Sequence, residues 1–197
     1  MMNAIRLRTE YLKDPMGIGT AQPQLFWNCV DGISQSAYQV VCRDENGEPL
    51  WDSGKVSSSS MRVRYGGATL DSRARVSWQV RLWDENGRPG DWSETACFEL
   101  GLLSSADWTA KWIAGNYPVN KKRRYPVDCF RKTFEVGQVK NARLYAAACG
   151  LYEGRLNGAR VGDFMLAPGH TDYRKRVQYQ TYDVTDLLQD GENELAF

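Results

Sequence analysis

Hydrophobic and polar residues alternate along several stretches of this chain, as they do in β-strands that bury one face. The alternation is clearest in residues 38–42 and 76–82. Their expected inward-facing residues are Tyr38, Val40, Cys42, Val76, Trp78, Val80 and Leu82. The first half of the chain is therefore predicted to form sheets around a hydrophobic core.

The second half shows the same pattern with smaller side chains. Strands are expected at residues 130–134, 141–148 and 177–182, and Thr185 is expected to cap a single helical turn through Leu188. The slim inward face of the middle strand would consist of Ala142, Leu144, Ala146 and Ala148. Residues 194–197 look like a strand that has barely begun, because strands usually run about five or six residues. We therefore expect this second part to be truncated.

The tetrapeptide Asp-Glu-Asn-Gly occurs at residues 44–47 and again at 84–87, just after the two clearest strands. Asn-Gly is a strong hairpin signal, because both central residues of a type I′ turn need positive φ. A third Asn-Gly pair follows at residues 157–158. A calcium loop would need oxygen ligands at alternating positions, and a paired-carboxylate site would need one buried acid. Neither pattern is met, so we predict three type I′ hairpin tips with solvated carboxylates.

Residues 104–128 are rich in Ser, Asn, Pro and charged residues, which is typical of a connector between domains. Trp108 and Trp112 are four residues apart after Asp107, a spacing that favours a short helical turn packed against a sandwich. The basic run at residues 121–124 resembles a localisation patch, but it is short and the neighbouring chain is not basic. We favour a solvated loop for this run.

The composition is that of an ordinary globular protein, with 197 residues of which 42% are hydrophobic and 25% charged. A formal net charge of +1 gives no electrostatic case for nucleic-acid or membrane partners. The N-terminus lacks the apolar run of a signal peptide. The five cysteines have no metal-ligand spacing and are expected to be reduced and buried. These features favour a cytoplasmic protein, or a secreted one if a leader has been removed.

Polar and aromatic residues gather around the Pro-Gly pair at residues 168–169. Aromatic rings beside charged hydrogen-bonding groups are typical of a site for a polar ligand such as a sugar. The candidate binding residues are Asp172, Tyr173, Arg174, Arg176 and Tyr179, with His170 beside them. The alternative is that these residues brace the loop or dock against a missing domain. A single histidine cannot form a multi-histidine metal site, and no catalytic, metal or cofactor site is predicted.

Two stretches resemble known domains. Residues 5–102 resemble a fibronectin type III or immunoglobulin-like sandwich, through the early Trp27, the strand containing Tyr38, and the hairpin VRLWDENGRPGDWSE. FRKTFEV and ARLYAAACGLYEGRLNGARVGDFMLAPGHTDYRKRVQYQTYDVTDLLQDGEN are similar to the N-terminal galactose-binding-like, jelly-roll sandwich of bacterial α-L-rhamnosidases, glycoside hydrolase family 78. The motifs WDSGKV, DWTAKWI and FRK also follow that family's order.

The predicted fold class is therefore all-β, with two β-sandwiches in tandem. The expected domains are a fibronectin type III-like sandwich at residues 1–103, a connector at 104–128, and the beginning of a galactose-binding-like sandwich at 129–197.

The resemblance implies an enzyme that hydrolyses terminal α-L-rhamnose with inversion, using two carboxylates on an (α/α)6 barrel C-terminal to both sandwiches. Inversion needs these carboxylates about 6.5–9.5 Å apart, with space for the attacking water. No position of this chain matches a catalytic residue of the family, so the chain is expected to be a non-catalytic accessory region. Its implied partners are the catalytic barrel of a longer protein and rhamnose-containing glycans. The alternative is a stand-alone carbohydrate-binding or adhesion module.

Overall fold

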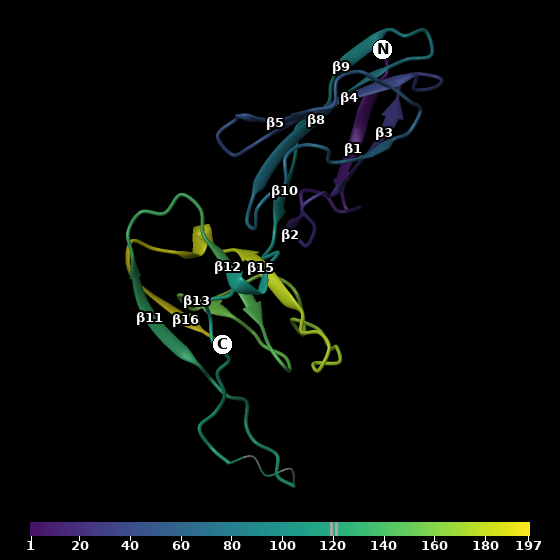
Figure 1. The fold of residues 1–197 in the computed structure, drawn as a ribbon. Helices are drawn as coiled ribbons and strands as arrows, with labels where there is room; N and C mark the ends of the chain where they lie inside the picture. The colour runs from purple at the N-terminus through teal and green to yellow at the C-terminus, as the bar shows by residue number, and fades with distance from the viewer. Residues whose placement is uncertain (119, 121) are drawn as a thin grey trace. The chain divides into compact units, whose positions relative to one another are not determined.

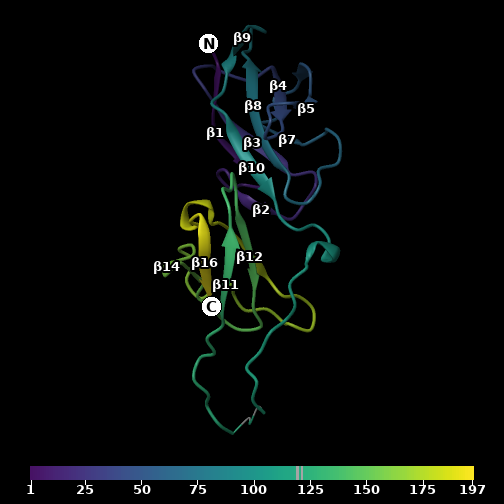
Figure 2. The same cartoon turned by 90° about the vertical axis from the view of Figure 1, so that its left-hand side faces the viewer.

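The computed structural model describes residues 1–118, 120 and 122–197, and their secondary structure consists of β-strands and two short 3₁₀ turns (Figures 1 and 2). The chain divides into two compact units, Met1–Thr109 and Ala110–Phe197. Each unit is a set of sheets around its own core, so the predicted all-β class is confirmed.

The first unit contains two sheets. The smaller sheet has the order β1-β3-β7, with strands β1 (Asn3–Thr9), β3 (Gln24–Val30) and β7 (Arg62–Arg64). The larger sheet has the order β2-β10-β8-β4-β5, with strands β2 (Met16–Ile18), β10 (Ala96–Leu100), β8 (Arg75–Trp83), β4 (Ala37–Arg43) and β5 (Pro49–Asp52). Two further strands pair at its margins, β6 (Val56–Ser57) with β4 and β9 (Pro89–Trp92) with β8.

The core of the first unit is formed by the strands whose alternation was clearest. β4 and β8 are antiparallel neighbours, with Val40 opposite Val80, and both side chains are completely buried. All seven predicted inward-facing residues of these strands are buried. Trp27 of β3 faces them from the smaller sheet, with its ring centroid 5.1 Å from that of Tyr38. The two sheets therefore enclose one hydrophobic core, as in a β-sandwich.

The first Asp-Glu-Asn-Gly hairpin has a different turn from the one predicted. Gly47 has a positive φ of 86°, but Asn46 does not have positive φ. The Asp44 N–H donates to the Glu48 carbonyl at 2.9 Å, and the Gly47 N–H donates to the Asp44 carbonyl at 3.1 Å. This is a three-residue loop in which a type I turn is followed by a left-handed glycine. The type I′ prediction was therefore wrong here.

The Asp44 side chain explains the difference. Its Oδ1 accepts hydrogen bonds from the backbone N–H groups of Asn46 and Glu48, both at 2.8 Å. Asp residues stabilise turns in this way, by bonding backbone two residues further on. The second copy repeats the arrangement with Asp84, Asn86, Gly87 and Arg88. These carboxylates are therefore structural parts of the loops, and not merely solvated side chains.

The third Asn-Gly pair forms the predicted type I′ turn. Asn157 and Gly158 both have positive φ, 51° and 79°. They join strands β13 (Arg155–Leu156) and β14 (Ala159–Arg160). The Asn157 amide is held by the Leu187 carbonyl and by Asn193, so its left-handed conformation is supported by other segments of the second unit.

The second unit also has two sheets. One has the order β11-β16-β13-β14, with β11 (Arg131–Val136) and β16 (Gly191–Ala196) as its long pair, and the other pairs β12 (Arg143–Ala147) with β15 (Tyr179–Asp183). The prediction that residues 194–197 only begin a strand was wrong. β16 starts three residues earlier, at Gly191, and pairs with β11 at all six of its positions.

The hydrophobic core of the second unit is small. The buried core residues among those described are Leu156, Val161 and Val184. Partly buried residues pack around them, namely Phe134, Ala142, Leu144, Tyr182, Leu187, Leu188 and Leu195. Ala146 of the predicted slim face is also buried. Large hydrophobic side chains remain exposed elsewhere in this unit, including Trp112, Ile113, Val127, Leu151, Phe164, Met165 and Leu166.

The described residues form two short 3₁₀ turns; the second lies where a single turn was predicted, and the first does not contain both tryptophans. The first 3₁₀ turn is Ser105–Asp107; the Ser104 side chain accepts from the Ala106 N–H, and Asp107 accepts from the Ser104 N–H. Asp107 therefore closes a capping box and does not start a turn that contains both tryptophans. Trp112 lies outside this turn and is 68% exposed. The second 3₁₀ turn, Thr185–Leu187, has Val184 at its N-cap, so Thr185 is not the cap.

All five cysteines are free thiols, but their burial differs from the prediction. Cys42 is buried in the first core, and its burial raises the pKa of its thiol to about 12. Cys97, Cys129 and Cys149 are exposed. The expectation that the cysteines act as small core residues therefore holds for Cys42 and is wrong for these three.

Candidate functional site

The predicted binding loop surrounds an open hollow of about 560 Å³, lined by residues 170–174 of the second unit. Gly169 enters the loop with a positive φ of 98°, a conformation that glycine adopts without steric cost. The Asp172 carbonyl then accepts from the N–H groups of Lys175 and Arg176, at 2.8 and 2.9 Å, which closes a tight turn. The hollow is thus formed by one short stretch of chain.

Asp172 and Arg174 form a bidentate ion pair on the rim of this hollow. Arg174 Nε lies 3.0 Å from Asp172 Oδ1, and Arg174 Nη2 lies 3.1 Å from Oδ2. The Arg174 side chain, and then the Arg174 backbone N–H, lower the pKa of the Asp172 carboxyl. The Arg174 side chain is 90% exposed, so the pair contributes little to stability. A ligand that used either charge would have to compete with this pair.

The remaining candidate residues divide into two groups. His170 and Tyr173 lie together, with ring centroids 5.4 Å apart in an edge-to-face arrangement, and both line the hollow. The lining does not include Arg176, whose carbonyl accepts from the Thr171 hydroxyl, or Tyr179, which lies on β15 with its ring 6.2 Å from that of Tyr145. The structure therefore brings together Asp172, Tyr173 and Arg174, and places the other two candidates elsewhere.

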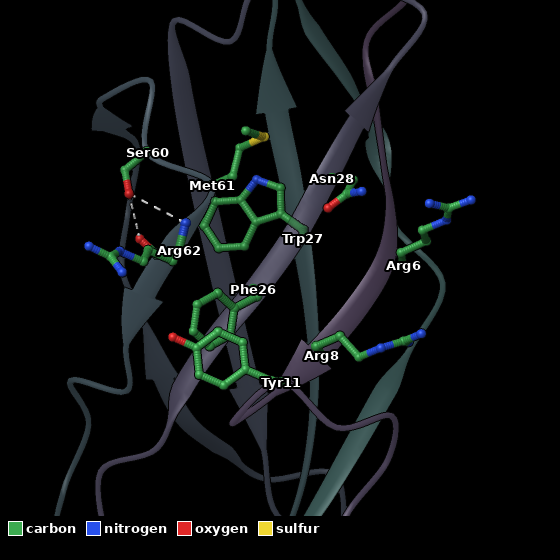
Figure 3. Close-up of a pocket in the computed structure, with 9 residues that line it drawn as sticks. All are labelled: Arg6, Arg8, Tyr11, Phe26, Trp27, Asn28, Ser60, Met61 and Arg62. Carbon is green, nitrogen blue, oxygen red and sulfur yellow. Dashed lines mark hydrogen bonds between the residues drawn. The ribbon is translucent and has the colours of Figure 1, made fainter.

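A second hollow, of about 440 Å³, lies on the smaller sheet of the first unit and was not predicted (Figure 3). Its lining residues are Arg6, Arg8, Tyr11, Phe26, Trp27, Asn28, Ser60, Met61 and Arg62. The rings of Tyr11 and Phe26 pack together, with centroids 4.4 Å apart. The residues come from three strands and their adjoining loops, so no single stretch of sequence reveals the site. The one signal in the sequence is the pair of arginines in Ile5-Arg6-Leu7-Arg8.

The described part of the chain contains neither a metal-binding cluster nor a membrane-spanning helix. Across residues 1–118, 120 and 122–197, no group of three or more His, Cys, Asp or Glu side chains is placed to hold a metal ion. None of the helices in those same residues is long and apolar enough to cross a membrane. Within the basic run, Lys121 lies outside the described residues, and Lys122, Arg123 and Arg124 are exposed.

Two family models match this chain in sequential order. Residues 4–104 match the Rha78A-like N-terminal immunoglobulin domain, and residues 137–197 match the α-L-rhamnosidase N-terminal domain. The first match alone spans just over half of the chain. The chain belongs to the α-L-rhamnosidase family. The family predicted from the sequence is therefore confirmed.

Individual α-L-rhamnosidases match over nearly the whole chain. The α-L-rhamnosidase of Formosa agariphila is 41% identical over 95% of this chain, which is 22% of that protein. The structure of α-L-rhamnosidase from Dictyoglumus thermophilum has a TM-score of 0.87 and 34% identity, covering 98% of this chain and 24% of that one. The structure of native α-L-rhamnosidase from Aspergillus terreus has a TM-score of 0.87 and 33% identity, and the match covers 100% of this chain and 23% of that one.

The chain therefore spans less than a quarter of the length of these α-L-rhamnosidases. The two domain models that it matches are both N-terminal ones. It corresponds to the N-terminal, non-catalytic region of the family.

Proposed function

We propose that this chain supports the catalytic part of a longer α-L-rhamnosidase, which hydrolyses terminal α-L-rhamnose from glycans or glycosides. The observation that carries this proposal is the extent of the match, 95% of this chain against 22% of the Formosa agariphila relative. In this account the catalytic part is the (α/α)6 barrel implied by the family resemblance. The two sandwiches would hold the barrel and shape the approach of the glycan.

The exposed hydrophobic residues of the second unit support such a docking role. Phe164, Met165 and Leu166 are consecutive and are 52%, 68% and 67% exposed. Runs of exposed apolar residues are unfavourable in water unless another surface covers them. Trp112 and Val127 of the same unit are also more than half exposed. We assign segment 164–166 to the contact with the catalytic part, because it is the longest such run.

The domain boundaries are part of the same proposal. A fibronectin type III-like sandwich at residues 1–103, a connector at 104–128 and a second sandwich from 129 onward would separate a rigid first sandwich from the docking sandwich. The capping box at Ser104 lies close to the end of the first unit, Met1–Thr109, which supports a boundary in this part of the chain.

A direct test compares this 197-residue chain with the longer protein from the same gene. Both are purified and assayed on p-nitrophenyl α-L-rhamnopyranoside. The proposal predicts hydrolysis by the longer protein and no hydrolysis above the blank by the 197-residue chain. Hydrolysis by the chain alone, or none by the longer protein, would contradict it.

The second candidate function is a stand-alone carbohydrate-binding module, and the hollow at residues 170–174 favours it. L-Rhamnose titrated into the 197-residue chain, and followed by NMR, tests this candidate. Chemical-shift changes that are confined to the surroundings of His170 and Tyr173, and that are lost in the Tyr173→Ala variant, would support a carbohydrate-binding module. If L-rhamnose causes no chemical-shift changes, the chain is not a rhamnose-binding module, and only the supporting role remains.

A further inference from the structure

The hollow on the smaller sheet of the first unit depends on an irregularity in β1. Its pairing with β3 shifts by one residue, since Ile5 lies opposite Asn28 whereas Arg8 lies opposite Phe26. The extra residue is accommodated at Arg6, which has a positive φ of 52°. This is a β-bulge, a feature that re-aims the side chains of a strand.

The bulge changes which face of the sheet the two arginines occupy. Ala4 is buried in the core, so a regular strand would direct Arg6 and Arg8 inward as well. After the bulge, Leu7 packs against the core and Thr9 is buried. Arg6 and Arg8 therefore lie on the outer face, where both line the hollow. Arg6, whose backbone is strained, therefore lies at the position that places the Arg6 and Arg8 side chains on this surface.

A third arginine completes a row across the sheet. Phe26 of the central strand lies directly opposite Arg8 of β1 on one side and Arg62 of β7 on the other. Directly opposite residues share one face of a sheet. Figure 3 shows the rings of Tyr11 and Phe26 between Arg62 on one side and Arg6 and Arg8 on the other.

These three guanidinium groups are not neutralised by the protein. The ion pairs found among the described residues do not include Arg6, Arg8 or Arg62. The nearest acidic residue in the sequence, Glu10, uses its Oε1 to accept the Gln24 backbone N–H at 2.7 Å. Three positive charges on one face of a sheet, without an ion-pair partner in the described part of the chain, create a positive potential that attracts anions.

The aromatic part of the hollow is also held in an unfavourable backbone conformation. Glu10 and Tyr11 form a two-residue turn in which both have positive φ, 47° and 68°. The turn is closed by reciprocal backbone hydrogen bonds between Thr9 and Leu12, both at 2.9 Å. Bulky residues rarely adopt this conformation, and such residues cluster at active sites and ligand-binding sites. The turn sets the Tyr11 ring, 70% exposed, upon Phe26.

We propose that this surface binds an anionic saccharide, one that carries carboxylate or sulfate groups. The exposed aromatic face would pack against the C–H face of a sugar ring, and the arginines would bind its acidic groups through charge-assisted hydrogen bonds, Arg8 with the donors that its bond to the Leu7 carbonyl leaves free. The Asn28 side chain offers a further partner for sugar hydroxyls, whereas the Ser60 hydroxyl already donates to the Arg62 carbonyl at 2.9 Å. The choice of a saccharide over another anion rests on the proposed function, in which the longer protein acts on a glycan.

The test is calorimetric titration of the 197-residue chain with three oligosaccharides of equal length. These are a galacturonic-acid hexamer, a sulfated hexasaccharide and neutral maltohexaose. Binding to one or both anionic hexamers, at least about tenfold tighter than to maltohexaose, is expected. Which anionic hexamer binds more tightly distinguishes carboxylate from sulfate. Equal affinity for all three, or no binding of either anionic one, would overturn the proposal.

Variants locate the binding. Arg8→Gln combined with Arg62→Gln should weaken anionic binding by about tenfold or more, since each arginine makes charge-assisted bonds. Tyr11→Gly should weaken it through loss of the ring while leaving all charges in place. The charge-matched control, Arg123→Gln with Arg124→Gln, alters exposed arginines of the second unit and should leave the affinity within about twofold. Binding that both sets of variants leave unchanged would place the ligand elsewhere and refute this site.

Two further readouts separate this inference from its alternatives. Polyglutamate that binds as tightly as the anionic hexamers would overturn the assignment to a saccharide. Hydrolysis of p-nitrophenyl α-L-rhamnopyranoside by the longer protein tests the proposed function independently. Hydrolysis without anionic binding refutes only the inference, and anionic binding without hydrolysis refutes only the proposed function.

Discussion

The ring of Tyr11 packs on that of Phe26, with centroids 4.4 Å apart, although the backbone of Tyr11 lies in the left-handed region. A non-glycine residue held there costs of order 1–3 kcal/mol. The contact of two partly exposed rings contributes about 0.5–1.5 kcal/mol. The turn therefore gains little stability from Tyr11, and the residue is better explained by the surface that it builds.

This balance predicts a small effect for Tyr11→Gly. The glycine relieves the backbone strain, but the ring contact is lost and the unfolded chain gains about 0.5–1 kcal/mol of conformational entropy, so the free energy of unfolding should change by less than about 1 kcal/mol. Urea unfolding followed by tryptophan fluorescence measures it. A loss of about 3 kcal/mol would show that Tyr11 is mainly a structural residue.

Gln35 is predicted to be important for stability because it satisfies a buried polar network. Its Nε2 donates to the carbonyls of Ser58 and Ser60, and its Oε1 accepts from Trp27 Nε1, all at 2.9 Å. Gln35→Leu should lower the free energy of unfolding by about 2–4 kcal/mol, because these partners are left unsatisfied. Gln189→Leu removes an exposed side-chain bond to the Glu192 carbonyl and should change it by less than about 0.5 kcal/mol. Equal effects of the two substitutions would argue against the network.

Asp44 is predicted to make stability depend on pH. Backbone hydrogen bonds, first that from Glu48, lower the pKa of its carboxyl below the ordinary value of 3.8 in the folded protein. The unfolded state then binds more protons, so stability rises with pH between the folded pKa and 3.8 and is lost as pH falls through that window.

Asp44→Asn is the matched variant, since its amide oxygen can still accept the two backbone bonds but does not titrate. Below pH 3.8, the free energy of unfolding of this variant should depend less on pH than that of the wild type. An identical pH dependence, measured by chemical unfolding at several pH values, would show that Asp44 is not a source of it.

Segment 164–166 is predicted to matter only in the longer protein. Phe164 is 52% exposed in this chain, so Phe164→Ser should leave the unfolding temperature of the 197-residue chain nearly unchanged. In the longer protein the same change should lower the unfolding temperature by several degrees, because a covered aromatic ring is lost. Differential scanning calorimetry compares wild type with Phe164→Ser, once in the 197-residue chain and once in the longer protein. Equal effects in the two proteins would remove this segment from the docking surface.

The parts of the fold that could be predicted from the sequence depend on local patterns. The alternation in residues 76–82 requires only neighbouring residues, and all its inward positions are buried. The turn at Asn46 was predicted wrongly, because the Asp44 carboxylate stabilises a competing turn. The start of β16 at Gly191 was missed because pairing with β11, and not local composition, extends the strand.

The candidate sites were harder to predict, because closeness in sequence is not closeness in space. Arg176 and Tyr179 are near Asp172 in the chain but do not line its hollow. Arg8 and Arg62 are far apart in the chain, yet both flank Phe26. Finding that row requires the register of three strands, including a bulge that alternation alone does not reveal.

We propose that this chain is the supporting N-terminal region of an active α-L-rhamnosidase. The most direct measurement is immunoprecipitation from the source cells with an antibody against residues 1–197, followed by a blot and an assay on p-nitrophenyl α-L-rhamnopyranoside. We expect a band several times heavier than 22.4 kDa, and we expect the hydrolytic activity to be recovered in the precipitate. A band at 22.4 kDa, with no activity recovered, would contradict it.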